Sequence, residues 1–410
     1  MGKPKIRFKG YEDDWEQRKL GEIATEIYGG GTPKTSNEEF WKGDIPWIQS
    51  SDLIDECLFD VRPRKCISQE AVSKSATKLV PQNSIAIVTR VGVGKLAFMP
   101  FSYATSQDFL SISELKTAPE FTVYALYRMM QLVSNEVQGT SIKGITKDEL
   151  LAKKIIFPSC NEQKKIGAYL HNLDHLITLH QRKCEETKSL KKYMLQKMFP
   201  ENGNCVPKIR FSGFADDWEQ RKLGSLCDVF TDGDWIEAKD QSDSGIRLVQ
   251  TGNVGTTEYL DKKNNKKWIS EETFERLHCE EIYEGDILIS RLPEPAGRAC
   301  IMPDLGVRMI TAVDCTIVRT SKGYDSKYLV QYLSTPMYFK VVNSFLGGGT
   351  RQRISRGNLS GIDIPIPSTI DEQGKIGELF ANFDHLITLH QHKCDELQKL
   401  KKFMLQNMFV

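Results

Sequence analysis

Apolar residues recur at helical spacing along two long segments, residues 162–199 and 372–409. They line up into a wide stripe, which is the pattern of an amphipathic helix. Each helix would run for about 38 residues and span about 55 Å, at ~1.5 Å per residue. A soluble helix of that length would leave its stripe in water, so we predict that the two helices pack on each other. The residues assigned to this helix pair, or to a partner that covers it, are Ile166, Leu173, Leu176, Ile177, Leu190, Met194, Ile376, Phe383, Leu386, Ile387, Leu400 and Met404.

The two helical segments are copies of one sequence. Residues 173–199 and 383–409 are identical at about two thirds of their positions, and residues 4–23 recur as residues 207–226. Internal repetition of this kind predicts two tandem units of about 200 residues, each ending in its long helix. A pseudo-two-fold relation between the units would bring the end of the chain close to its start.

The interiors of the two units, residues 24–157 and 227–366, diverge almost completely. Unlike interiors between shared flanks suggest one scaffold that carries two different recognition surfaces. Short strand-like and helix-like segments alternate there without a βαβ rhythm, which predicts a mixed α/β (α+β) fold class. We expect two globular domains separated by the two long antiparallel helices. The predicted boundaries are 1–158 for the first recognition domain, 159–200 for the first long helix, 201–367 for the second recognition domain and 368–410 for the second long helix.

Local signals place several shorter elements. Ser159 with Glu162, and Thr369 with Glu372, have the spacing of capping boxes at the starts of the long helices. Thr146 with Glu149 has the same spacing before a short helix. The repeated PKIRF, which opens at residues 4 and 207, looks like a basic strand. Further helices are predicted at 68–76, 119–136, 270–278 and 325–335, with strands near 45–49, 84–89 and 284–292.

Charge and composition exclude some classes of protein. Lys and Arg number 55 against 54 Asp and Glu, a net charge of +1, which argues against a lone, tightly binding nucleic-acid protein but leaves room for local basic surfaces. The ten cysteines have no metal-like spacing and are predicted to be reduced thiols. The start is polar, and no apolar run reaches the ~18 residues of a membrane span, so we expect a cytoplasmic protein.

The sequence carries no catalytic motif. It has no P-loop, no nucleophile elbow, no zinc-protease or dinucleotide-binding motif and no adenine-methyltransferase motif. His175 and His180 recur as His385 and His390 on the long helices, where packing or an interface explains them better than general-base catalysis. We therefore predict a chain that is not an enzyme and that binds no metal.

Several polar loops have the composition of a DNA-binding surface. Glycine lets the backbone approach phosphate, and Arg, Lys and Gln can reach base edges. Each residue taken alone is more often a solvated loop residue, and the run 351–353 after three glycines is the least ordinary. The candidates in the first unit are Lys34, Thr35, Gln49, Arg90, Lys95, Gln107, Thr140, Ser141 and Lys143. Those in the second are Trp235, Gln250, Arg291, Arg298, Thr350, Arg351, Gln352, Arg353 and Arg356.

These motifs resemble a known family. GGTPKTSNEEFWKGDIPWI at 30–48, GDILISR at 285–291, and the two EQxKI segments that open the long helices are similar to the specificity subunits of type I restriction-modification enzymes. The resemblance covers the whole chain in the family's order of recognition domain, helix, recognition domain, helix. The second unit departs from it by having TDGDWIEA at 231–238 in place of GGTP.

The resemblance implies a function. Each recognition domain would read one half of a bipartite double-stranded DNA target, and the helix pair would set the spacer between the halves. Two methyltransferase (modification) subunits, which use S-adenosylmethionine, would dock on the scaffold. Restriction subunits, which are translocases dependent on ATP and Mg, would complete a nuclease in a bacterial or archaeal cell. The chain itself would hold no cofactor.

The residues alone leave other functions open. One is a non-catalytic protein–protein scaffold with two divergent binding domains, and another is a non-specific RNA-binding chain. Salt-dependent, sequence-selective DNA binding in the presence of a methyltransferase partner would separate the first function from both.

Overall fold

The computed structural model describes residues 3–138, 144–201, 204–262, 264–346 and 352–410. The chain divides into two units. Unit 1 comprises residues 1–180 and 393–410, and unit 2 comprises residues 181–392. Each unit therefore contains one globular domain together with part of helix α4 (Cys160–Met198) and part of helix α9 (Ile370–Asn407). These units differ from the predicted tandem units, each of which ends in a complete long helix, because the two helices pack on each other and each is shared between the units.

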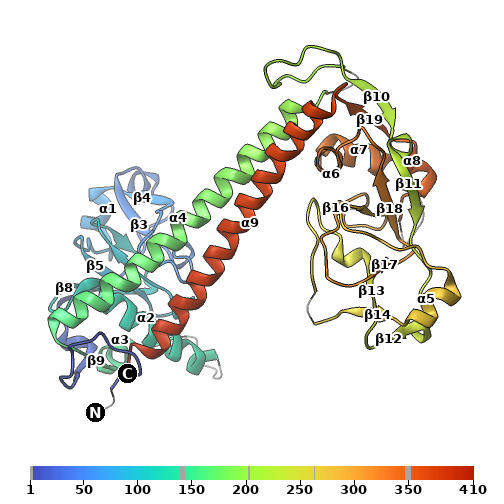
Figure 1. Ribbon diagram of the computed structural model, residues 1–410. Helices are drawn as coiled ribbons and strands as arrows, with labels where there is room; N and C mark the ends of the chain where they lie inside the picture. Colours follow the sequence, from blue (N-terminus) through green and yellow to red (C-terminus); the bar gives the residue numbers. More distant parts are fainter. Residues whose placement is uncertain (1–2, 139–143, 202–203, 263, 347–351) are drawn as a thin grey trace. The chain divides into compact units, whose positions relative to one another are not determined.

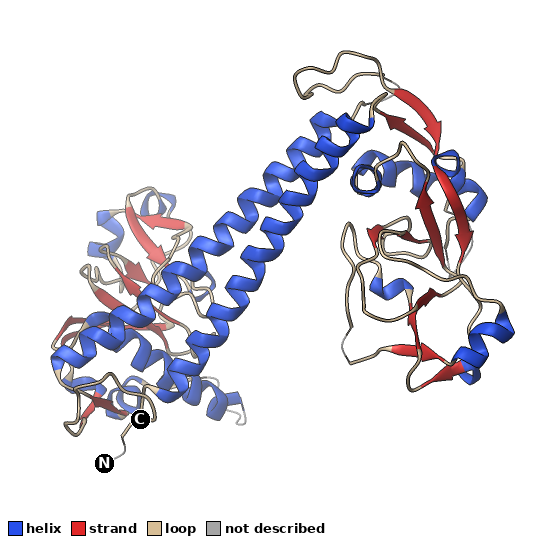
Figure 2. Cartoon of the chain, viewed as in Figure 1, coloured by secondary structure: helices blue, strands red, loops and turns tan. Residues whose placement is uncertain are grey.

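The globular domain of unit 1 is built on two small sheets (Figures 1 and 2). One is antiparallel with the strand order β2-β8-β5-β6, and the other has the order β4-β3-β7 with β3 parallel to β7. Strand β1 pairs with β9 and so joins the start of the domain to its end. The elements are β1 Glu16–Lys19, β2 Ala24–Gly29, β3 Ile45–Ile48, β4 Lys65–Ile67, α1 Gln69–Lys74, β5 Ser84–Val88, β6 Leu96–Met99, β7 Ala104–Thr105, β8 Phe109–Leu115, α2 Pro119–Gln138, α3 Lys147–Ala152 and β9 Lys154–Phe157.

The domain of unit 2 repeats this topology with one added strand, β12, although its sequence differs. Its sheets have the orders β11-β18-β15-β16 and β12-β14-β13-β17, with β13 parallel to β17, and β10 pairs with β19. The elements are β10 Glu219–Lys222, β11 Cys227–Asp232, β12 Gln241–Ser242, β13 Ile246–Val249, β14 Lys267–Ile269, α5 Glu271–Leu277, β15 Ile287–Ser290, β16 Ala299–Ile301, β17 Met309–Thr311, β18 Cys315–Thr320, α6 Ser326–Tyr332, α7 Pro336–Ser344, α8 Arg356–Ser360 and β19 Asp363–Ile366. The predicted mixed α/β class, and the prediction of one scaffold beneath two different sequences, are confirmed.

Local capping explains several helix starts. The hydroxyls of Ser68 and Ser270 accept backbone N–H bonds at the starts of α1 and α5, and Thr146 forms the predicted capping box with Glu149 at α3. Helix α7 follows α6 after a short turn and is absent from the sequence-based prediction. Its start is capped by Thr335, with a proline in the first turn.

The two long helices pack antiparallel within each unit. In unit 1 the Cys394 thiol lies 3.7 Å from the carbonyl oxygen of Ile177, and in unit 2 the Cys184 thiol lies 3.9 Å from that of Ile387. The predicted interface residues divide by exposure. Buried are Ile166, Leu173, Ile177 and Ile376; half-buried are Met194, Phe383, Ile387 and Met404; exposed are Leu176, Leu190, Leu386 and Leu400. Only part of the apolar stripe is therefore buried where the two helices pack together, and the rest stays exposed.

A phenylalanine from the end of a long helix completes the core of each unit. In unit 1, Phe409 stacks on Phe121 of α2 with the ring centroids 5.2 Å apart. In unit 2, Phe199 stacks on Phe380 of α9 at 5.8 Å. The end of the second repeat thus contributes to the core of the first unit, and the end of the first repeat to the core of the second.

The start of each repeat does not form the predicted strand. Residues 4–8 are irregular, because Arg7 turns to helix α4 and donates two hydrogen bonds to Glu162, from Nε at 2.7 Å and from Nη2 at 2.9 Å. Arg210 binds Glu372 of α9 in the same way, at 2.6 and 2.8 Å. The repeated segment that opens each repeat is therefore anchored to the start of a long helix. We call the ion pairs Arg7–Glu162 and Arg210–Glu372 the clasp.

This clasp also corrects the predicted capping boxes. The Thr369 hydroxyl does accept the backbone N–H of Glu372, at 3.3 Å. The carboxylates of Glu162 and Glu372, however, are occupied by the two arginines instead of returning to the helix start. Both glutamate side chains are almost fully buried, at 0% and 1% exposure, so the guanidinium groups are their main compensation.

We expect the substitution Arg210→Met to destabilise unit 2 strongly. It would leave the Glu372 carboxylate buried without its cation, a change that typically costs about 3–5 kcal/mol. Urea unfolding followed by circular dichroism measures the loss. The matched control is Arg221→Met, because Arg221 pairs with Glu219 at 2.6 Å with both side chains more than half exposed, and such pairs contribute about 1 kcal/mol or less. Equal losses in the two variants would contradict this account of the clasp.

The two ends of the chain lie together in unit 1. The backbone N–H of Ile6 donates to the carbonyl of Asn407 at 2.9 Å, and Figure 1 shows the N and C marks close to each other. The corresponding bond in unit 2 joins Ile209 to Lys197, also at 2.9 Å. The predicted approach of the ends is confirmed, and the natural connection at 200–206 shows how short a linker can be.

A circular permutant should therefore fold. Its ends at 3 and 410 would be joined by a linker of similar length to 200–206, and the chain would be opened near Gly203, which lies outside the described residues. Because the Ile6–Asn407 bond already holds the ends together, we expect the thermal unfolding midpoint to change by only a few degrees. Loss of the cooperative transition would show that residues 200–206 are needed for more than connection.

Candidate nucleic-acid interface

The glycine loop at 30–35 is fixed tightly in unit 1. The Gly31 carbonyl accepts bonds from Trp47 Nε1 and from the Thr77 hydroxyl, both at 3.0 Å. A Cβ at Gly31 would lie 2.6 Å from the carbonyl carbon of Ala76, and one at Gly30 would overlap the carbonyl oxygen of Ser106. Only glycine allows this approach, so the GGTP motif is explained by backbone packing, and the residues after it are presented at a defined place.

Four loops of unit 1 meet at the same end of its sheets. Backbone bonds join Gly31 to Thr105 at 2.8 Å, Ser106 to Ile48 at 3.0 Å and Thr89 to Asp108 at 2.7 Å. The loops that carry the sequence-predicted candidates Lys34, Thr35, Gln49, Arg90, Lys95 and Gln107 are thus brought together. The candidates Thr140, Ser141 and Lys143 lie outside the described residues.

The side chains of this group differ in what they can offer a ligand. Lys34, Thr35, Arg90 and Gln107 are exposed, and Gln49 is half-buried. Lys95 is already engaged, because its ammonium group donates to the Leu53 carbonyl at 3.0 Å and so braces the 49–53 loop. The exposed face therefore combines two cations with two hydrogen-bonding side chains, which fits contacts to both phosphates and base edges.

Unit 2 gathers the equivalent loops. Asp234 bonds to Thr311 at 2.9 Å, and Arg291 to Asp314 at 2.9 Å, through backbone groups. The Ile354 N–H then donates to the Arg291 carbonyl at 3.2 Å, which brings the segment at 352–354 to the same place. Burial raises the pKa of the Asp234 carboxyl above its ordinary value, against the lowering effect of the Glu280 N–H that donates to it.

Two of the predicted arginines in unit 2 have structural partners instead. Arg298 donates to the carbonyls of Thr251, Val254, Leu292 and Pro295 at 2.7 to 3.0 Å, and burial lowers its pKa. Arg291 is only 6% exposed and donates to the Val313 carbonyl at 2.6 Å. Both guanidinium groups therefore hold the loops together through backbone carbonyls.

The strand register explains why Arg291 does not resemble Arg90. Val88 pairs with Phe109 in unit 1, and Ser290 pairs with Cys315 in unit 2. Because Gly30 and Gly233 donate to the carbonyls of Phe109 and Cys315, these two pairs are equivalent. Arg291 thus corresponds to Thr89, one residue before Arg90, and it faces the opposite side of the strand.

The remaining candidates of unit 2 are accessible. Trp235 is 71% exposed, Gln250 is half-buried, and Gln352 is exposed. Arg353 is exposed, with its Nη1 atom 3.5 Å from the carboxylate of Asp314. Thr350 and Arg351 lie outside the described residues.

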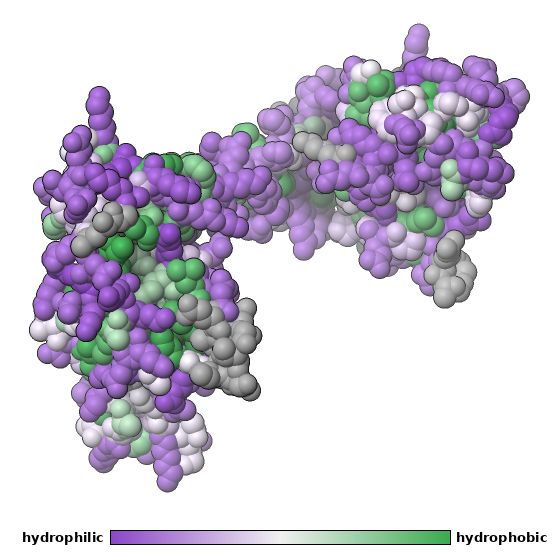
Figure 3. Space-filling view, turned by 90° about the horizontal axis from the view of Figure 1, so that it is seen from below, coloured by the Kyte–Doolittle hydropathy of each residue, from purple (hydrophilic) through white to green (hydrophobic). Residues whose placement is uncertain are grey.

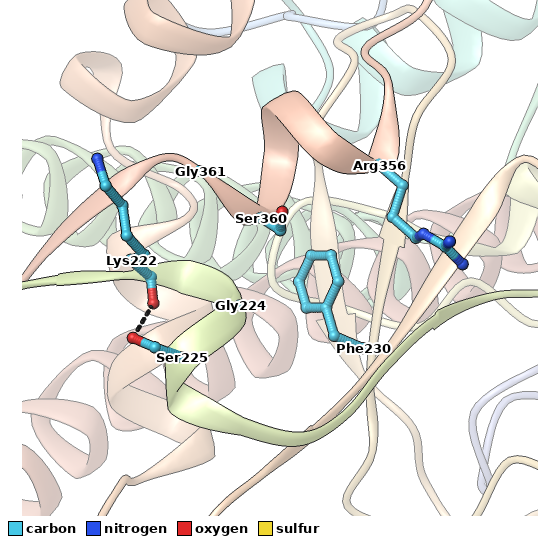
Figure 4. Close-up of a pocket in the computed structure, with 7 residues that line it drawn as sticks. All are labelled: Lys222, Gly224, Ser225, Phe230, Arg356, Ser360 and Gly361. Atoms are coloured by element: carbon cyan, nitrogen blue, oxygen red, sulfur yellow. Dashed lines mark hydrogen bonds between the residues drawn. The ribbon is translucent and has the colours of Figure 1, made fainter.

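Arg356 stands at the start of α8 beside a shallow open pocket (Figure 4). In this view its guanidinium extends past the Phe230 ring, away from Lys222 on the other side. Serine, glycine and phenylalanine form the rest of the lining, and Ser225 donates to the Lys222 carbonyl at 2.6 Å. The pocket therefore offers cationic and hydroxyl groups for contacts with a ligand.

Sequence reasoning missed one basic segment in each unit. Arg62 and Arg64 precede β4, and Lys262 and Lys266 precede β14. Arg64 donates to Asp52 at 2.6 Å, next to the Gln49 loop, and Lys262 lies against Gly252 beside Gln250. The signal was present as K-x-I-S at 65–68 and 267–270, a similarity inside the interiors that seemed unrelated. These residues add cations beside the loops that carry Gln49 and Gln250.

Arg353 is the most testable side chain of this face. If it makes a bidentate contact to a base, Arg353→Ala should weaken DNA binding by about 1–3 kcal/mol and relax one target position. If it contacts a phosphate, all sequences should weaken alike, and the salt slope should fall by about one. Fluorescence anisotropy over a range of salt concentrations distinguishes the two. Arg308→Ala is the control, since Glu271 and Glu281 hold Arg308; unchanged affinity at Arg353 would place it outside the interface.

No group of three or more His, Cys, Asp or Glu residues in the described part of the chain is placed to hold a metal ion. No helix among the described residues has the length and apolar content needed to cross a membrane.

Comparison with known proteins decides the family. The model of the type I restriction-modification DNA specificity domain matches residues 12–189 and again residues 215–399. The chain belongs to this family. The two matches fall on the two repeats, so each globular domain with its adjoining helix is one copy of the family's domain.

Relatives and a solved structure are similar to the chain in the same way. The MjaIX specificity subunit of Methanocaldococcus jannaschii is 30% identical over 238 residues, 53% of this chain and 52% of that protein. The EcoR124I/EcoR124II specificity subunit of Escherichia coli is 34% identical over 182 residues, 42% of this chain and 43% of that protein. The chain thus spans about half the length of these curated relatives. The crystal structure of the S subunit of a type I system from M. genitalium has the same fold, with a TM-score of 0.66 at 13% identity, covering 100% of this chain and 99% of the other.

Both long helices carry apolar side chains that no other part of the described chain covers. In unit 1 the exposed apolar residues are Leu176, Leu179, Leu400 and Phe403, with exposures from 36% to 51%. In unit 2 they are Leu190, Tyr193, Leu386 and Leu389, from 42% to 52%, apart from Ile370 at the first position of α9. Each residue of one helix has its counterpart 210 positions later in the other. Figure 3 shows green apolar side chains among hydrophilic ones on the face of unit 1 that it presents. We call these eight residues the exposed row.

Proposed function

We propose that the chain is the DNA-specificity subunit of a type I restriction-modification enzyme, and that each unit reads one half of a bipartite target. The observation that carries this proposal is the pair of domains with one topology and different loop residues. A shared scaffold with Lys34, Arg90 and Gln107 on one copy, and Trp235 and Arg353 on the other, is what two different half-sites require.

The loop chemistry favours DNA over a protein ligand. Exposed arginine, lysine and glutamine lie at the ends of loops that glycine holds close to the sheet, and basic segments flank them. Phosphate contacts from the basic segments would position the duplex, while the loop side chains would read base edges. The alternative, a scaffold with two protein-binding domains, predicts apolar pockets at these loops. The described loop residues are mostly polar, and the exposed apolar side chains among them, Ile54, Val91 and Trp235, are single residues that line no described pocket.

The exposed row supports two identical partners. It presents four large apolar side chains in each unit at repeat-related positions, so the same helical surface of a partner could cover either one. We assign this surface to two methyltransferase subunits, which would supply S-adenosylmethionine, and we assign ATP and Mg to restriction subunits that join them. This chain would hold no cofactor and would act as a non-catalytic targeting subunit in the cytoplasm.

Methylome sequencing tests the proposal. A host that expresses the chain with its methyltransferase subunit should gain methylation at one bipartite motif with a single spacer. The purified chain alone should transfer no methyl group to mixed DNA in a labelled-methyl assay. Methyl transfer by the chain alone, or methylation without any shared motif in the host, would overturn the proposal.

The partner surface has its own test. Leu179→Glu combined with Phe403→Glu places two charges in the exposed row of unit 1 only. Sedimentation of the reconstituted complex should then show one methyltransferase subunit where the unmodified chain binds two. Thr178→Glu is the matched control, because Thr178 is exposed on the same helix but outside the row. Two bound subunits in the double variant would rule out this surface.

A further inference from the structure

A buried lysine ties three elements together in unit 1. Lys401 of α9 is 7% exposed, and its ammonium nitrogen lies 2.5 Å from Oδ1 of Asp174 on α4. The other oxygen of Asp174 accepts the hydroxyl of Tyr124 at 2.5 Å, and Tyr124 belongs to α2 of the globular domain. Lys401 also donates to the Glu56 carbonyl at 3.3 Å. One polar network therefore connects both long helices to the recognition domain.

Unit 2 contains the same network at repeat-related positions. Lys191 of α4 is 9% exposed and lies 2.5 Å from Oδ1 of Asp384 on α9. The other oxygen of Asp384 accepts the amide of Gln331 at 2.8 Å, and Gln331 belongs to α6 of the second recognition domain. The lysine and the aspartate are 210 residues from their counterparts in unit 1, whereas tyrosine has been replaced by glutamine.

Stability alone does not explain these pairs. Replacing a buried ion pair by apolar residues of similar volume is often neutral or even stabilising, because charges lose much solvation on burial. Such a pair provides geometric specificity. Its hydrogen bonds form in only one arrangement of the surrounding helices, whereas apolar contacts allow the helices to shift relative to each other. In each unit that arrangement is the placement of the recognition domain on the two helices.

The two networks are not equally complete. In unit 1 the Glu56 carbonyl adds a further bond to the lysine, close in sequence to the loop at 49–53 that carries Gln49. In unit 2 the Gln331 side-chain oxygen has no hydrogen-bond partner. Unit 1 is therefore the more firmly braced of the two, and its lysine is the better place for a test.

We infer that Lys401 with Asp174, and Lys191 with Asp384, are positioning pairs that hold each recognition domain at one angle on its helices and so make the enzyme selective for one spacer length. The inference rests on the proposed function. It concerns the strictness of spacer selection, which depends on how rigidly each domain is held, and leaves the reading of bases to the loops.

The test uses the full complex of the chain with its methyltransferase subunit. Its substrates carry both half-sites unchanged, with the spacer at its native length and one base pair shorter or longer. With Lys401→Met we expect the preference for the native spacer to fall by about tenfold, equivalent to ~1.4 kcal/mol of positioning energy. The base preference within each half-site should stay the same, and Lys401→Arg should restore part of the spacer preference.

Two further variants keep the outcome decisive. Lys402→Met is the control, since Lys402 is the exposed neighbour of Lys401, and it should leave the preference unchanged. The triple variant Tyr124→Phe, Asp174→Leu, Lys401→Met removes every charge of the network and should remain folded while losing spacer selectivity. An unchanged preference in a folded triple variant overturns the inference, and so does failure of both Lys401→Met and the triple variant to fold, because the network would then serve folding itself. An unmodified complex that methylates no bipartite site would instead contradict the proposed function.

Discussion

Exchanging residues 227–366 for the same segment of another family member should change one half of the methylated motif and leave the other half as it was. All the accessible candidate residues of unit 2 lie inside this segment, and those of unit 1 lie outside it. The clasp of Arg210 on Glu372 and the Phe199–Phe380 stack also lie outside it and stay intact. The expected effect is complete, because a half-site is either read by the new domain or not read at all.

Two contacts cross the boundary of the exchanged segment and must be kept. Strand β19 is within the exchanged segment and pairs with β10 through backbone groups, which most sequences can maintain. Gln331 is also exchanged, so the new segment should be chosen to carry a residue that can donate to Asp384. Methylome sequencing of the host gives the result, and the reciprocal exchange of 24–157 is the control. A change in both halves of the motif would contradict the modular account.

Repetition and periodicity predicted the framework. The apolar stripe and the two repeats identify α4 and α9 and the approach of the chain ends, because these features are set by local spacing and by duplication. Helices with a side-chain cap, such as α1 after Ser68 and α3 after Thr146, were also predictable, since their signals lie within four residues. Which apolar rows stay uncovered depends on the packing angle of two helices, and spacing alone does not determine it.

The failures share one cause, which is contact between residues distant in sequence. Arg7 and Glu162 are 155 residues apart, so local reading assigned the first to a strand and the second to a capping box. Arg291 matched a family motif, yet the register of β15 against β18 turns it into the protein. Arg298 lies in a polar loop of the composition expected for DNA contacts. Its guanidinium instead donates to four backbone carbonyls that come together only in the folded protein.

The candidate site was predictable as a set of loops and not as a set of side chains. Loops holding Lys34, Gln49, Arg90 and Gln107 do meet, because the end of an antiparallel sheet gathers the turns between its strands. The basic residues Arg62 and Lys262 were missed because they lie in polar stretches without glycine. Aligning K-x-I-S at 65–68 with its copy at 267–270 would have found them.

The helix pair should act as a ruler for the spacer of the DNA target. Helix α4 continues from unit 1 into unit 2, and α9 returns. Under the proposed function we therefore expect the length of the two helices to set the distance between the half-sites. His180, Lys183 and Thr187 interrupt the apolar stripe in the middle of α4, and His390 and Lys393 interrupt it in α9, so we expect packing to constrain the register least there. Packing there rests on a buried thiol, Cys184, against the backbone of α9, and the ion pairs of Lys191 and Lys401 hold the helices further along.

Inserting four residues beside Cys184 adds about one helical turn, or ~6 Å. DNA rises by about 3.4 Å per base pair along each strand, so the recognised spacer should lengthen by one or two base pairs while both half-site sequences stay the same. A second variant carries four-residue insertions in both helices, one beside Cys184 and one beside Cys394. Both helices then lengthen equally, and the ion pairs Lys191–Asp384 and Lys401–Asp174 can both form. An insertion in α4 alone must be absorbed by a bulge in that helix or by loss of one ion pair. It should therefore lengthen the recognised spacer by no more than the double insertion does. Methylome sequencing of both variants measures the spacer directly, and an unchanged spacer with activity retained would mean that the helices do not set the distance.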